Sequence, residues 1–126
     1  MIHKLGQVML YVDDQDKAVA FWTEKAGFVV RSEENNGEGM KWYEIAPSAD
    51  AETAIVLHDK AVVAKMSPMV NLQTPSLMFY ADNIEAMYDD FKAKGVTVGQ
   101  LVEMPMGKVF NFADAEDNYF AVVEKK

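Results

Sequence analysis

Hydrophobic and polar residues alternate along two stretches of the chain, Lys4–Val12 and Pro75–Ala81. Alternation with a period of two is typical of a β-strand whose faces differ in polarity. Each stretch is followed by acidic residues and then by apolar residues at helical spacing, which end at Gly27 and at Gly95. Acidic residues favour the start of a helix and glycine favours its end, so both segments are predicted to be strand–helix units.

The two strand–helix units are copies of each other. A shift of 69 positions places Met9–Val12 on Met78–Ala81, and it also places Trp22 on Phe91. A duplicated unit folds as two similar halves, so we expect a ligand to bind between them.

Three further strands are predicted after each helix, separated by turn-forming residues. In the first half they begin at Phe28 and extend over Lys41–Ile45 and Thr53–His58, and in the second they cover Thr97–Val102, Val109–Phe112 and Tyr119–Val123. Each half therefore reads β-α-β-β-β, and the fold class is α+β. We expect a single domain, 1–126, with module one at 1–59, an irregular connection at 60–74 and module two at 75–126.

The composition narrows the classes of partner. The net charge is −8 and the chain has one arginine, Arg31, which argues against binding to nucleic acid. No stretch approaches the roughly 20 apolar residues of a membrane span. Cysteine is absent, which excludes disulfides, thiolate metal ligands and cysteine nucleophiles. Because no hydrophobic leader is seen at Met1–Lys4, we expect a cytoplasmic protein.

The late segment Phe112–Asn118 resembles a family signature, Phe-x-Asp-Pro-Asp-Gly-Asn, with departures at Ala115, Glu116 and Asp117. Together with the paired β-α-β-β-β pattern, it makes the chain resemble the glyoxalase/bleomycin resistance/extradiol dioxygenase proteins, called vicinal oxygen chelate proteins. Further similar stretches are Val12–Asp14, Phe21-Trp22 before Gly27-Phe28, and Lys41–Glu44. The resemblance implies that each sheet curls into a half-barrel around a cavity, with its helix outside, and that the protein forms a homodimer.

The resemblance also implies four metal-ligand positions, which are Gln7, Val56, Ser76 and Ala121. Only Gln7 offers a ready donor, since Val56 and Ala121 carry none and a serine hydroxyl is a poor ligand. We therefore predict that the family's metal site is lost and that no cofactor is bound. The alternative is a relocated site built from Gln7, Glu44 and His58.

The residues predicted to contact a ligand share the inward face or the walls of the cavity. They are Gln7, Met9, Tyr11, Trp42, Val56, His58, Ser76, Met78, Tyr80, Phe110 and Ala121. Several have two interpretations. His58 is either a catalytic proton carrier or a structural residue that hydrogen-bonds the following loop. The repeat-related Tyr11 and Tyr80 either face each other across the cavity or fill core volume, and Trp42 and Phe110 either wall the pocket or pack in the core.

Three functions follow from these residues. The first is a metal-free protein that binds a small organic molecule in the cavity. The second is a lyase, isomerase or dioxygenase-type enzyme with a relocated metal, or with metal-free acid–base chemistry around His58. The third is an interaction module without a small ligand. Lactoylglutathione lyase activity is not expected, because the ligand positions do not support it.

Overall fold

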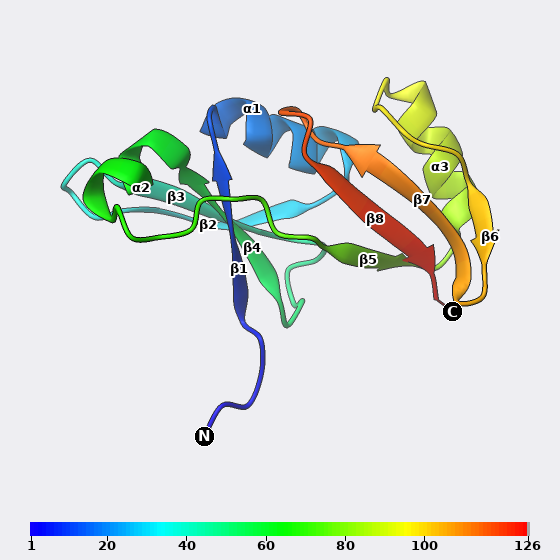
Figure 1. The fold of residues 1–126 in the computed structure, drawn as a ribbon, viewed down its shortest axis with the longest axis horizontal. Coiled ribbons are helices and arrows are strands. Elements are labelled where there is room, and N and C mark those ends of the chain that lie inside the picture. Colours follow the sequence, from blue (N-terminus) through cyan, green and yellow to red (C-terminus); the bar gives the residue numbers. More distant parts are fainter. Residues whose placement is uncertain (126) are drawn as a thin grey trace. The chain divides into compact units, whose positions relative to one another are not determined.

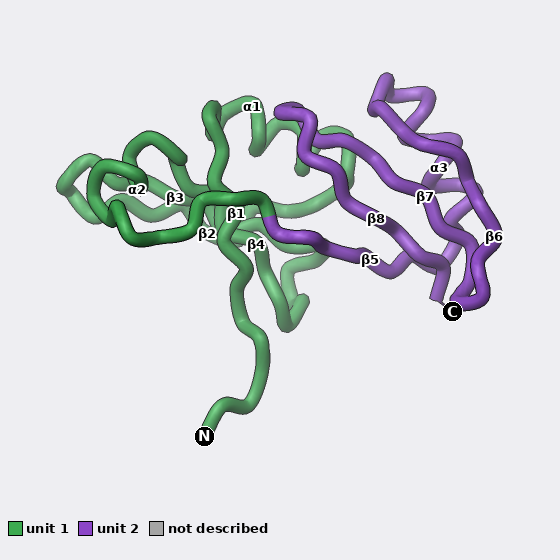
Figure 2. Tube along the Cα trace, viewed as in Figure 1, with its two compact units in different colours: residues 1–74 green, residues 75–126 purple. Residues whose placement is uncertain are grey.

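The computed structural model describes residues 1–125, and the chain divides into two compact units. Unit 1 covers residues 1–74 and unit 2 begins at Pro75 (Figure 2). The division falls where the second module was predicted to start.

Unit 1 contains a four-stranded sheet in the order β1-β4-β3-β2. Its strands are β1 (Gln7–Val12), β2 (Val29–Asn35), β3 (Lys41–Ala46) and β4 (Ala54–Asp59) (Figure 1). Strands β1 and β4 are parallel, whereas β2–β3 and β3–β4 are antiparallel. Its helices are α1 (Gln15–Ala20), which continues as the π-helical turn η1 (Phe21–Lys25), and α2 (Lys60–Met66).

Unit 2 repeats this topology with its own sheet, in the order β5-β8-β7-β6. Its elements are β5 (Met78–Ala81), α3 (Ile84–Ala93), β6 (Val102–Met104), β7 (Gly107–Ala113) and β8 (Tyr119–Glu124). The edge strand β5 is parallel to β8, as the edge strand β1 is to β4 in unit 1. The α+β class and the two β-α-β-β-β modules are thus confirmed.

Each unit buries a large aromatic side chain at the repeat-equivalent position of its helical segment. Trp22 has 0% of its surface exposed and Phe91 2%. Trp22 packs against Phe28, with ring centroids 5.0 Å apart, and Phe91 packs edge-on against Phe112 at 5.3 Å. Burial of a side chain of this size contributes roughly 1.5–3 kcal/mol. These contacts therefore fix which face of each sheet is covered by a helix.

Two predicted elements differ from the structure. The segment 60–74, predicted as an irregular connection, contains α2, whose only buried residue is Val63. A seven-residue helix with one buried position shows no apolar stripe, so the sequence pattern missed it. The predicted strand Thr97–Val102 is reduced to an isolated bridge at Val98, and the strand itself, β6, begins at Val102.

The two main helices begin with equivalent side-chain caps. The Asp14 carboxylate accepts a hydrogen bond from the backbone N–H of Lys17 at 3.1 Å, and the Asn83 side-chain oxygen accepts one from Ala86 at 3.2 Å. Asp14 and Asn83 are related by the same 69-residue shift. The acidic residue Asp82 lies one position before the cap.

We expect Asp14→Ala and Asn83→Ala each to lower the free energy of unfolding by about 1 kcal/mol, because each leaves a helix N–H without its acceptor. Asp82→Ala is the control and should change stability by less than half as much. Urea unfolding followed by circular dichroism measures all three. An equal loss in Asp82→Ala would contradict the observed capping.

The turn between β7 and β8 keeps its shape despite the departures from the family signature. Asp114 Oδ1 accepts hydrogen bonds from the backbone N–H groups of Glu116 and Asn118, both at 2.9 Å. Asp117 has φ +62°, a left-handed conformation that favours glycine. An aspartate tolerates this conformation better than most residues, which explains why the turn survives.

Asp117→Gly should therefore stabilise the protein, by roughly 0.5–1 kcal/mol, because it relieves the left-handed strain. Thermal unfolding measures the change. Asp117→Ala serves as the comparison and should be destabilising, since alanine has neither the freedom of glycine nor a polar side chain. A lower melting temperature for Asp117→Gly would show that the aspartate side chain itself supports the turn.

Candidate functional site

The strand register of unit 1 places most of the predicted unit 1 residues on one face of its sheet. Across β1 and β4, Met9 lies opposite Val56 and Tyr11 lies opposite His58. Across β4 and β3, His58 lies opposite Trp42. We call this the open face of unit 1, and it comprises Gln7, Met9, Tyr11, Trp42, Glu44, Ala54, Val56 and His58. The other face carries the core residues that pack on the helical side, such as Leu10, Ile45 and Leu57, each with 0% exposure.

Three rings from three neighbouring strands meet on the open face. The Tyr11 and His58 rings are stacked, with centroids 5.9 Å apart and planes 22° apart. Trp42 lies on the other side of His58, at 5.8 Å and 40°. All three side chains are half-buried. This aromatic cluster, Tyr11, His58 and Trp42, is a preformed, partly exposed apolar surface of the kind on which flat molecules stack.

His58 sits at the centre of the aromatic cluster. Its Nδ1 atom is buried and has no hydrogen-bond partner among residues 1–125. Burial lowers the pKa of the imidazole, so the ring is neutral at neutral pH. The structural interpretation, in which His58 hydrogen-bonds the loop after β4, is not supported at Nδ1.

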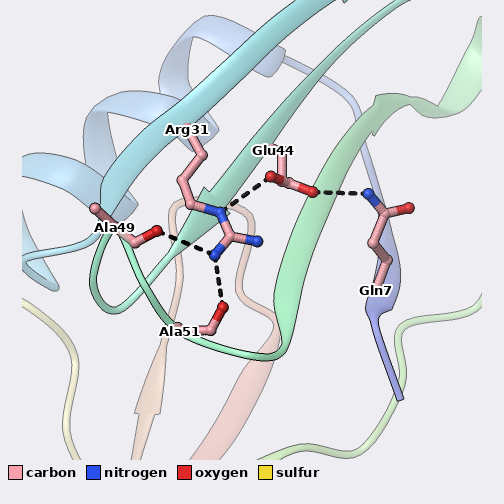
Figure 3. A network of polar contacts seen from close by, with 5 residues as sticks. All are labelled: Gln7, Arg31, Glu44, Ala49 and Ala51. Atoms are coloured by element: carbon pink, nitrogen blue, oxygen red, sulfur yellow. Dashed lines mark hydrogen bonds and ion pairs between the residues drawn. The ribbon is translucent and has the colours of Figure 1, made fainter. Parts of the chain in front are cut away.

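A second feature of the open face is a chain of polar contacts across the sheet. Gln7 Nε2 donates a hydrogen bond to Glu44 Oε2 at 2.8 Å, and Arg31 Nε donates to Glu44 Oε1 at 3.0 Å (Figure 3). Arg31 Nη1 also donates to the carbonyl oxygens of Ala51 at 2.6 Å and of Ala49 at 3.4 Å. We call Gln7, Glu44 and Arg31 the polar bridge.

The polar bridge links three of the four strands and crosses above β4, where the short side chains of Ala54 and Val56 lie. The pKa of Glu44 lies below its usual value because the carboxylate accepts hydrogen bonds, first from Gln7 and then from Arg31. Glu44 is therefore ionised at neutral pH, and both of its oxygens have donors. Arg31 was not identified as a site residue from the sequence. The one signal in the sequence was an arginine that directly follows the apolar run Phe28–Val30.

The residues present do not fit the family's metal ion. Val56 and Ala121 carry no side-chain donor atom and the Ser76 hydroxyl is a poor ligand, so Gln7 is the one ready donor among the four family positions. In the described part of the chain, no group of three or more His, Cys, Asp or Glu residues comes together as a metal site. The alternative relocated site is also disfavoured, because both carboxylate oxygens of Glu44 already accept hydrogen bonds.

Unit 2 presents a much less polar version of the same face. Met78 lies opposite Ala121 and Tyr80 lies opposite Val123, with Tyr80 72% and Met78 47% exposed. Val109 lies opposite Val123 as Trp42 lies opposite His58. The positions of His58 and Trp42 are therefore valines in unit 2. Ser76, the repeat partner of Gln7, is exposed and precedes β5.

Phe110 is not on this face. It is 1% exposed and packs edge-on against Tyr88 and Phe91 of α3, with centroid distances of 5.1 and 6.0 Å. The prediction that Phe110 walls the pocket was wrong, and its alternative, core packing, holds. Its position depends on the register of β7 with β8, where Val109 and Asn111 take the open side.

Comparison with known proteins agrees with this architecture. The family model of the Glyoxalase/Bleomycin resistance protein/Dioxygenase superfamily matches residues 4–122. The chain belongs to this superfamily. The predicted resemblance is thus confirmed.

Three relatives illustrate the similarity. The chain is 35% identical to YetH of Bacillus subtilis (strain 168) over 125 residues, which covers 98% of this chain and 100% of YetH. The crystal structure of UcmS2 matches with 30% identity and a TM-score of 0.79, covering 98% of each chain. The crystal structure of TnmS3, an antibiotic binding protein from Streptomyces sp. CB03234, matches with 24% identity and a TM-score of 0.82, covering 99% of this chain and 98% of TnmS3. Over residues 1–125, no helix has both the length and the apolar character needed to cross a membrane.

The lowered pKa of His58 predicts how stability depends on pH. Unfolded histidine takes up a proton near pH 6.5, whereas folded His58 does so at lower pH. The unfolded state therefore binds more protons as the pH falls below about 6.5, and the protein loses stability there. The variant His58→Phe keeps a ring in the cluster, and its free energy of unfolding should fall less over the same pH range.

Urea unfolding of both proteins at about pH 7.5 and about pH 5 tests this difference, since other groups titrate in both proteins. If both proteins lost the same free energy of unfolding between these pH values, protonation of His58 would not be the cause of the loss. A ring-proton NMR titration should give His58 a midpoint below the ordinary histidine value of about 6.5.

Proposed function

We propose that this protein binds a small, planar aromatic molecule on the open face of unit 1, without a metal ion. The observation that carries the proposal is the aromatic cluster, in which Tyr11 and Trp42 flank His58 and all three rings are partly exposed. Offset or edge-on ring contacts contribute about 0.5–1.5 kcal/mol beyond the burial of area. Rigid rings also lose little conformational entropy when a ligand binds.

The composition of the cluster supports binding over simple core packing. A buried polar atom without a partner lowers stability by roughly 1–3 kcal/mol, and His58 Nδ1 is such an atom. The equivalent position in unit 2 is the apolar Val123, which has no such penalty. Residues that lower stability are expected at sites under functional constraint, so the histidine is better explained by a ligand than by packing.

The exposed neighbours of the cluster also suit a ligand. Met9 is 36% exposed and lies beside Tyr11 on the same face of β1. A flexible thioether adapts to varied apolar shapes and makes favourable contacts with rings. TnmS3, which shares this fold, is an antibiotic binding protein, so the fold accommodates an antibiotic in that protein.

Acid–base catalysis by His58 is the alternative, and the structure favours it less. A catalytic histidine is usually oriented by a hydrogen bond to its second ring nitrogen, and Nδ1 of His58 lacks one within the described residues. Lactoylglutathione lyase activity is not part of the proposal. We retain the expectations of a single domain, a homodimer and a cytoplasmic location as parts of the proposal.

The proposal predicts that planar two- and three-ring compounds, such as naphthols and stilbenes, raise the melting temperature of the protein, whereas saturated analogues such as decalin-2-ol do not. Tyr11→Leu and Trp42→Leu should each weaken binding about three- to tenfold, since each removes a ring–ring contact. Isothermal titration calorimetry measures the affinities of the compounds selected by thermal shift.

Tyr43→Leu is the matched control, because Tyr43 neighbours Trp42 on β3 but lies opposite Leu57, on the helical side. It should leave affinity unchanged. If no compound of the aromatic library raised the melting temperature, the proposal would be rejected and an interaction module without a small ligand would be favoured. Turnover of a bound compound that is lost in His58→Phe would instead establish the enzyme.

A further inference from the structure

The polar bridge fixes which atom of the exposed Gln7 side chain is offered to a ligand. Glu44 is ionised and accepts hydrogen bonds only, so Gln7 must direct its Nε2 donor toward it. The reversed amide would place its oxygen against a carboxylate oxygen, which is repulsive. Figure 3 shows the result, with the Gln7 amide oxygen directed away from Glu44. Gln7 thus presents an acceptor.

Arg31 holds the other end of this arrangement. Its Nε engages Glu44, and its Nη1 engages carbonyl oxygens of the loop between β3 and β4. Glu44 is therefore held from both sides, and its carboxylate cannot turn away from Gln7 without losing the ion pair with Arg31. The Nε and Nη1 groups of Arg31 are thus engaged within the polar bridge and its loop.

The acceptor lies in line with the aromatic cluster. Gln7, Met9 and Tyr11 alternate along the same face of β1. Gln7 and Tyr11 are four positions apart, which corresponds to about 13 Å along a strand. A molecule of two or three linked rings spans this distance and would lie over Met9.

We propose that Gln7 is a specificity-determining residue, and that the bound aromatic molecule carries a hydrogen-bond donor, a hydroxyl or N–H group, at the end that reaches Gln7 Oε1. This inference rests on the proposed function and deepens it. The polar bridge acts as a positioning relay, in which Arg31 holds Glu44 and Glu44 orients Gln7.

The test compares two probes with the same two-ring skeleton, 4-hydroxystilbene, whose hydroxyl donates, and 4-methoxystilbene, whose ether only accepts. We expect the protein to bind the hydroxyl compound about three- to tenfold more tightly, which is the contribution of one hydrogen bond. The stilbenes' own fluorescence reports binding.

Two substitutions separate the acceptor from the relay. Gln7→Met removes the acceptor at similar size and should abolish the preference while 4-methoxystilbene still binds. Glu44→Gln keeps the Gln7 amide but no longer fixes its orientation, so Gln7 can present either its oxygen or its N–H group. The ratio of the two affinities should then fall toward one, and 4-methoxystilbene should bind more tightly. Gln73→Met, the same change at an exposed loop position of unit 1, should preserve the preference.

The outcomes separate this inference from the proposed function. Equal affinity for the two stilbenes in the unaltered protein, or a preference that persists in Gln7→Met, would overturn the inference and leave aromatic binding intact. Failure of both stilbenes to bind would overturn the proposed function. NMR of the Gln7 side-chain amide tests the relay without a ligand, because a fixed amide gives two protected proton signals that collapse toward solvent-like values in Glu44→Gln. Solvent-like signals in the unaltered protein would refute the relay.

Discussion

Burial of Trp22 in unit 1 and of Phe91 in unit 2 is the constraint on which the rest of the structure depends. Each ring is almost completely removed from water beneath its helical segment, and each sits at the equivalent position of the repeat. Because side chains alternate along a strand, sealing one face of a sheet leaves every second residue on the other face. Leu10, Ile45 and Leu57 face the helical side of the sheet and form the core. The aromatic cluster and the polar bridge therefore lie on the opposite, open face.

The duplication shows which features belong to the fold and which belong to one unit. Caps at Asp14 and Asn83 and the left-handed Gly27 and Gly95 occur in both units. They shape the strand–helix connection, which each half must form. The histidine and tryptophan of the cluster occur in unit 1 only, with valines at the equivalent positions of β7 and β8. Side chains that the shared fold does not require are thus concentrated in unit 1, on the open face.

The sequence predicted the architecture well because period-two strands, helix caps and an internal repeat are all local signals. It placed Tyr11 and His58 correctly on one face, since parity within β1 and β4 decides this. It failed where long-range register decides, as for Phe110, whose side is set by pairing with β8. The polar bridge was only partly foreseen, because no local pattern shows that Arg31 reaches Glu44 across two antiparallel strands.

The polar bridge also suggests how a face that resembles a metal site can remain stable without an ion. A lone carboxylate on a partly buried surface is unfavourable unless a positive charge or several donors lie nearby. The Arg31 guanidinium supplies that charge at 3.0 Å from Glu44, and Gln7 completes the set of donors. Gln7, at a family ligand position, has therefore become part of an internal ion-pair network. Such a fixed network cannot carry out the chemistry of an exchangeable cation, but it holds an amide oxygen in one orientation, which is what selective binding of a donor-bearing ligand requires.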